Sequence, residues 1–197
     1  MAQKLRFQRP LGERRYKKLF VVSVEGSKTE PQYFAIFNQP QSIVLVKCLK
    51  RPSTESSPIQ VLKKMQGYLR KESLRKTDEA WIVVDKDTWT ENQLGELLQW
   101  AKKSENHGFA LSNPNFEYWL LLHFEDGKGI ASPQECLTRL KRHLPNYKKD
   151  IDDKKITLEL INKAIARAKQ RDVNRFNDLP SIWSTTVYKL VEKILEP

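Results

Sequence analysis

The chain has 197 residues, of which 39% are hydrophobic and 30% charged, a length and balance typical of one globular domain with a modest extension. Its longest apolar runs, such as Leu19–Val22 and Trp119–Leu122, are too short to cross a bilayer, and no apolar segment near the start fits a secretory signal. The only cysteines, Cys48 and Cys136, lie far apart. We therefore expect a cytoplasmic protein with no membrane partner, no disulfide framework and no zinc site.

Basic residues are in excess, with 35 Lys and Arg against 24 Asp and Glu and a formal net charge of +11. This excess favours DNA or RNA as a partner, because contacts to phosphates release counterions; a solvated basic surface is the simpler alternative. Residues 1–18 are rich in Lys and Arg and contain Pro10 and Gly12, so we interpret them as a basic N-terminal arm. The arm follows a phosphate backbone or is a disordered solubilising tail. The candidate nucleic-acid contacts in it are Arg14, Arg15, Lys17 and Lys18.

After the arm, short apolar runs alternate with segments of helical spacing. The apolar, often β-branched runs predict strands at residues 19–24, 43–46, 81–84 and 108–111. Apolar residues at helical spacing predict helices between them, at residues 29–37, 61–69 and 94–101. Strands that alternate with helices indicate right-handed crossovers, and therefore an α/β fold with a mainly parallel sheet flanked by helices.

Strand signals stop after Phe124. Three further helices are predicted, at residues 133–144, 157–169 and 185–195. The glycine-containing segment at residues 125–132 marks the change. We therefore predict an α/β core at residues 19–124 and a helical C-terminal part at residues 125–197.

Acidic residues directly follow two of the predicted strands. Glu25 follows the first strand, and Asp85 and Asp87 follow the third. Parallel strands open at one edge of a sheet, where ligands usually bind, and residues two apart in an extended chain point to the same side. Carboxylates gathered there suit Mg²⁺ or Mn²⁺. The alternative is that they are turn or helix-capping residues, and Asp87 before Thr88 fits that description.

These residues resemble a known fold and a known family. Glu25-Gly26 after one strand and Asp85-Lys86-Asp87 after another look like the TOPRIM fold, a metal-binding α/β module of topoisomerases, primases and nucleases. Residues 24–34 and 112–124 are similar to the RloB proteins, also called the AbiLii type. Thr88-Trp89-Thr90 stands where TOPRIM sites often have a glycine, which argues against a topoisomerase.

The resemblance implies a TOPRIM-like, Rossmann-like core and a bacterial phage-defence role of the abortive-infection kind. It also implies an AAA- or ABC-type ATPase partner, similar to the arrangement in OLD-family nucleases. On this basis we expect a Mg²⁺- or Mn²⁺-dependent nuclease that hydrolyses phosphodiester bonds in DNA or RNA. Metal ligands and catalytic groups would be Glu25, Asp85 and Asp87. Glu117, in the first turn of a helix, would complete the catalytic group as a ligand or a water-orienting base; its alternative role is to stabilise the helix N-terminus.

Other residues are assigned supporting roles. Lys28 follows Glu25 closely enough to hold a phosphate, and Asn113 is a candidate to support the carboxylates. His123 is either a proton shuttle or a hydrogen-bonded structural histidine. We expect Pro114 in the first turn of a helix capped by Ser112 or Asn113. The lysines interpreted as a solvated basic face are Lys148, Lys149, Lys154 and Lys155.

Two other functions remain open. One is an RNA-processing nuclease that resembles ribonuclease M5, a small TOPRIM protein. The other is a non-catalytic nucleic-acid-binding or regulatory subunit, which would bind with a steep salt dependence and no turnover. The sequence leaves DNA or RNA as substrate undecided, and it does not decide whether the chain forms a homo-oligomer.

Overall fold

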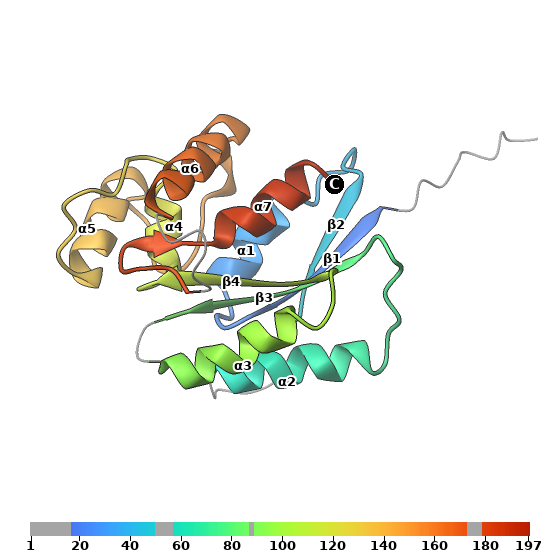
Figure 1. Cartoon of the computed structure of the whole chain (residues 1–197). Helices are drawn as coiled ribbons and strands as arrows, with labels where there is room; N and C mark the ends of the chain where they lie inside the picture. The colour runs from blue at the N-terminus through green and yellow to red at the C-terminus, as the bar shows by residue number, and fades with distance from the viewer. Residues whose placement is uncertain (1–16, 50–56, 87–88, 173–178) are drawn as a thin grey trace, which may run out of the picture.

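The computed structural model describes residues 17–49, 57–86, 89–172 and 179–197. Three predicted site residues, Arg14, Arg15 and Asp87, lie outside this part of the chain. In the described part, a five-stranded sheet lies between two layers of helices (Figure 1). None of the helices there is both long and apolar enough to pass through a membrane.

The sheet has the strand order β2-β1-β3-β4-β5. Its strands are β1 (Lys18–Val24), β2 (Val44–Cys48), β3 (Glu79–Asp85), β4 (His107–Asn113) and β5 (Ser184–Thr185). The pairs β1–β2, β1–β3 and β3–β4 are parallel, and β4–β5 is antiparallel. The four predicted strands and the mainly parallel α/β class are therefore confirmed.

The fifth strand was not predicted. Ser184 and Thr185 pair with Asn113 and Ser112, and the Ser112 and Thr185 hydroxyls lie 3.0 Å apart. The helix expected from residue 185 accordingly begins two residues later, at Val187. Two residues are too few to show strand periodicity, so only their partner strand defines them.

Helices cover both faces of the sheet. One face carries α2 (Pro58–Leu69) and α3 (Glu91–Ala101). The other carries α1 (Thr29–Ala35), α4 (Phe116–Leu121), α5 (Pro133–His143), α6 (Leu158–Arg171) and α7 (Val187–Leu195) (Figure 1). In β1, Phe20 and Val22 face the second group, whereas Val21 faces α2 and α3. Burial on both sides explains why this strand is almost continuously apolar.

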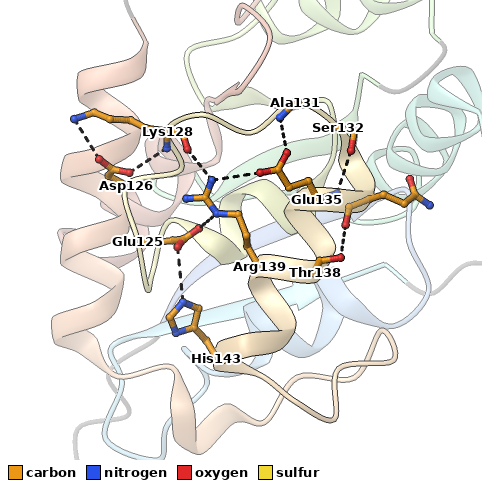
Figure 2. A network of polar contacts seen from close by, with 10 residues as sticks. Glu125, Asp126, Lys128, Ala131, Ser132, Glu135, Thr138, Arg139 and His143 are labelled. Carbon is orange, nitrogen blue, oxygen red and sulfur yellow. Dashed lines mark hydrogen bonds and ion pairs between the residues drawn. The ribbon is translucent and has the colours of Figure 1, made fainter.

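The C-terminal helices share one core with the sheet. That core extends from Phe20 to Ile194 and so runs across the boundary predicted at residues 124–125, which itself stays a prediction. The connection at 125–132 is bound to α5 by Arg139, which donates to Glu125 at 2.6 Å and to the Lys128 carbonyl at 2.7 Å (Figure 2). The loop that looked like a divider in the sequence is therefore held against the helix that follows it.

The free edge of strand β2 is hydrogen-bonded by a side chain. The Asn38 amide donates to the Val46 carbonyl and accepts from the Val46 N–H, both at 2.8 Å. The Val44 N–H donates to the Ser42 hydroxyl at 3.2 Å. These bonds occupy groups that would otherwise be free to pair with another strand.

Candidate functional site

Neighbouring strands bring two of the predicted acids together. Because Val24 of β1 pairs with Val83 of β3, Glu25 and Asp85 both lie at the carboxyl ends of these strands. The Asp85 N–H donates to Glu25 Oε2 at 3.3 Å, and the Glu25 N–H donates to the Val83 carbonyl at 3.3 Å. Residues 60 positions apart in the sequence are thus adjacent at the edge where ligands of parallel sheets bind.

Two more carboxylates join them around one cavity of about 300 Å³, which we call the carboxylate cavity. Glu30 comes from α1 and Glu117 from the first turn of α4, and both residues are buried. The cavity is lined by Glu25, Gly26, Ser27, Lys28, Thr29, Glu30, Asp85, Phe116, Glu117 and Lys149. It therefore gathers acids from four separate elements or loops.

A loop from the C-terminal part closes one side of the cavity. Tyr147 donates its hydroxyl to Glu117 Oε1 at 2.9 Å, and the Lys149 ammonium contacts the same oxygen. The loop is attached to α1 because Thr29 Oγ1 donates to the Lys149 carbonyl at 2.9 Å and the Ile151 N–H donates to Gln32 Oε1 at 2.7 Å. Glu117 is thus held by groups about 30 residues further along the chain.

The carboxylates strongly affect one another. Burial raises the pKa of Asp85 well above its usual range, and the charges of Glu30, Glu117 and Glu25 raise it further. Burial also raises the pKa of Glu30, although backbone hydrogen bonds, including one from Gly26, partly oppose it. Burial lowers the pKa of Lys149, but its hydrogen bond to Glu117 and the nearby acids outweigh this, so the net pKa is raised. The repulsion between these carboxylates would therefore be reduced by the binding of a further cation.

The donor chemistry fits a hard divalent cation, since four carboxylates line the cavity. Yet among the described residues no group of three or more His, Cys, Asp or Glu is arranged to hold a metal ion. The oxygens are engaged with protein donors instead: Glu25 with the Asp85 N–H, Glu30 with the Gly26 N–H, and Glu117 with Tyr147 and Lys149. A cation that bound these particular oxygens would compete with their donors.

The basic residues predicted to bind nucleic acid are divided between two places. Lys28 lines the cavity, with Nζ 4.0 Å from Asp150 Oδ2. Lys18 and Lys17 lie at the opposite end of β1, a seven-residue strand that spans roughly 20 Å. There Lys18 contacts Glu79 at 2.9 Å, and Lys17 contacts the Gln39 carbonyl at 3.4 Å. Their role in binding nucleic acid stays a prediction.

The two supporting residues make contacts away from the carboxylates. Asn113 donates to the Pro180 carbonyl at 3.0 Å. His123 is fully buried in the core, where Nδ1 lies 3.1 Å from the Trp119 carbonyl and Nε2 lies 3.1 Å from the Tyr33 hydroxyl. This arrangement corresponds to the structural alternative for His123, and neither residue lines the cavity.

The expected start of α4 is wrong by two residues. Ser112 and Asn113 belong to β4, and the helix begins at Phe116 after Asn115, with no side-chain cap. The predicted caps are unavailable because Ser112 contacts Thr185 and Asn113 contacts Pro180. Glu117 nevertheless lies in the first turn, as predicted.

Sequence reasoning missed three residues of the site: Glu30, Tyr147 and Lys149. A signal existed for Glu30, which follows Glu25 by five residues, but an acid in the first turn of a helix is ordinarily explained by the helix dipole. Lys149 was assigned to a solvated face; its side chain is 65% exposed, yet the ammonium contacts the buried Glu117. No local pattern indicates that contact.

The fold and the cavity define an α/β protein with an acidic site at the carboxyl ends of parallel strands. RloB-like proteins match this chain over residues 20–194, nearly its whole length. The chain belongs to the RloB-like family. No curated protein and no solved structure matches it significantly.

Proposed function

We propose that this protein is a TOPRIM-type, metal-dependent nuclease that hydrolyses phosphodiester bonds in DNA or RNA. We further propose that it acts in phage defence, a role with which membership of the RloB-like family is consistent, and that its partner is an AAA- or ABC-type ATPase. The observation that carries the proposal is the meeting of Glu25 and Asp85, from adjacent parallel strands, with Glu30 and Glu117 in one cavity.

The roles follow from position and charge. Glu25 and Asp85, which line the cavity, would hold Mg²⁺ or Mn²⁺ together with Asp87. In the alternative arrangement, Glu25 would act mainly as a general acid or base and the aspartates would be the metal ligands. The bound ion would supply Lewis-acid polarisation of the scissile phosphate. Glu117 and Glu30 would orient the attacking water or share the ion, and Lys28 at the cavity wall would attract the phosphate.

The test is incubation of the purified protein with DNA, RNA and tRNA in Mg²⁺, Mn²⁺ or EDTA, with and without an ATPase of the proposed AAA or ABC type. We expect cleavage that needs the metal and falls at least about 100-fold in Glu25→Gln and Asp85→Asn, because even outer partners of a metal cost up to that much. Glu159→Gln, an exposed carboxylate on α6 paired with Lys163, is the matched control. Cleavage that persists in both site variants would refute the assignment.

Two observations favour a second candidate, a nucleic-acid-binding or regulatory subunit without turnover. The cavity carboxylates are already paired with protein donors, Lys149 among them, and the chain carries a net charge of +11. Such a protein would bind nucleic acid with a steep salt dependence and would show no turnover in either Mg²⁺ or EDTA. Binding of this kind without cleavage of any of the three substrates would favour it.

A further inference from the structure

A lysine ammonium already pairs with one acid of the carboxylate cavity. Of its two lining lysines, Lys28 lies 4.0 Å from Asp150, which is outside the lining, whereas Lys149 contacts Glu117 directly. Glu117 is buried, with 6% of its side chain exposed. A buried carboxylate requires compensating charge or hydrogen bonds, and the Lys149 ammonium supplies the charge.

The backbone of the loop that contains Lys149 is fixed by hydrogen bonds, whereas the Lys149 side chain is largely exposed. Thr29 Oγ1 donates to the Lys149 carbonyl at 2.9 Å, and Gln32 bonds both the Asp150 side chain at 2.9 Å and the Ile151 N–H at 2.7 Å. The Lys149 backbone has φ 70°, a left-handed conformation that these bonds maintain. Because 65% of its side chain is exposed, the ammonium is able to leave Glu117 while the loop stays attached.

A divalent cation and the Lys149 ammonium would compete for the Glu117 carboxylate. The Tyr147 hydroxyl and the Lys149 ammonium both contact Glu117 Oε1. A metal that took this carboxylate would face a like charge within hydrogen-bond distance, and such repulsion is strong at a partly buried site. Tyr147 is neutral and presents no such repulsion, so the ammonium is the group that must move.

We propose that Lys149 is a displaceable counter-ion of the carboxylate cavity, which neutralises Glu117 until a divalent cation takes its place. The proposal rests on the metal-dependent function proposed above. It explains why Glu117 is paired with a protein cation in a structure whose described residues contain no group of three or more His, Cys, Asp or Glu arranged for a metal. It also implies that the displaced ammonium, on an exposed side chain that lines the cavity, becomes available to contact a phosphodiester.

Binding of Mn²⁺ alone, followed by the electron paramagnetic resonance signal of the free ion, tests this proposal without any cleavage assay. We expect Lys149→Met and Lys149→Gln to bind Mn²⁺ about 10-fold more tightly than the unaltered protein, and Lys149→Arg to stay within about 2-fold of it. Lys28→Met is the control for the general effect of removing a positive charge from the cavity wall. We expect it to change the affinity for Mn²⁺ by about 2-fold or less. In a Glu117→Gln background, Lys149→Met should change nothing further.

The possible failures separate cleanly. Equal changes in Mn²⁺ affinity in Lys28→Met and Lys149→Met would overturn the proposed exchange. So would a gain in affinity from Lys149→Met that persists in the Glu117→Gln background. Weaker Mn²⁺ binding in Lys149→Met would also overturn it, because Lys149 would then hold Glu117 in place for the metal. If Mn²⁺ binds the unaltered protein but no Lys149 variant differs, only this proposal fails; if Mn²⁺ binds none of the proteins, the metal-dependent function fails as well.

Discussion

The Glu30 carboxylate lies directly over Gly26. Its Oε1 accepts the Gly26 N–H at 2.8 Å, and a Cβ placed on Gly26 would lie only 2.1 Å from Glu30 Oε2. The absence of a side chain at Gly26 therefore allows the Glu30 carboxylate to reach the Gly26 N–H at the cavity wall, and a Cβ there would displace that carboxylate. Gly26 thus follows Glu25 in the sequence and binds the Glu30 carboxylate through its N–H.

Replacement of Gly26 by alanine should displace Glu30 from its hydrogen bond. Because Glu30 is buried, we expect the free energy of unfolding to fall by about 1–3 kcal/mol and Mn²⁺ binding to weaken, as measured by urea unfolding and by titration. Gly95→Ala in α3 is the control, since a Cβ there meets nothing within 4 Å and should stabilise the helix by about 0.5–1 kcal/mol. A Gly26→Ala variant that matches the unaltered protein in both measurements would contradict this account.

The parts predicted correctly from the sequence are those determined by local pattern. Strands β1 and β3 are buried on both faces, so their apolar runs are nearly continuous and end abruptly at Glu25 and Asp85. Parallel strands share one open edge, so the meeting of these two acids needed only that the strands be neighbours.

The parts that sequence could not supply depend on partners distant in the chain. Lys149 lies in a stretch of mainly polar and charged residues, and only its contact with Glu117, 32 residues away, distinguishes it from a solvated lysine. Likewise, Asn113 has a good capping side chain, but the Pro180 carbonyl takes its amide. Tertiary contacts override local preference at both positions.

The hydrogen bonds of His123 determine its tautomer. Since the Trp119 carbonyl can only accept, Nδ1 carries the proton and donates to it, and Nε2 accepts from the Tyr33 hydroxyl. Burial lowers the pKa of His123 to about 4. The folded protein therefore holds this ring neutral at pH values where the unfolded chain, with a pKa near 6.5, is protonated.

The consequence is a loss of stability in acid. The contribution of His123 is fully present above pH 6.5 or so and is lost as the pH falls toward about 4, by up to about 3 kcal/mol. His123→Gln should lower stability at pH 7.5 but flatten the dependence of Tm on pH between 7 and 4.5. His143→Gln, at a half-exposed histidine stacked on Phe124, should keep the full slope. An unchanged slope in His123→Gln would show that other groups cause the acid sensitivity.

The buried Asp78 and the half-buried Asp85 should respond to neutralisation in opposite directions. Burial and the neighbouring acids raise the pKa of Asp85, so the folded state binds its proton more tightly than the unfolded state does. Burial also opposes the charge of Asp78, but hydrogen bonds from Arg75 and the Leu19 N–H outweigh it and lower the pKa. Asp85 therefore costs stability once the pH rises above the unfolded pKa near 4, whereas Asp78 contributes stability there and loses it as the pH falls.

In EDTA at pH 7.5 we expect Asp85→Asn to raise Tm by at least roughly 2–4 °C, the equivalent of about 1 kcal/mol for a chain of this length. Asp78→Asn should lower Tm, because Arg75 and the Leu19 N–H lose a charged acceptor. Both differences should shrink toward pH 3, where the carboxyl groups of the unfolded chain are protonated. Calorimetry across this pH range checks the signs. A drop in Tm for Asp85→Asn at pH 7.5 would mean that its carboxylate is compensated in the folded protein, and the repulsion that makes the cavity attractive to a cation would then be absent.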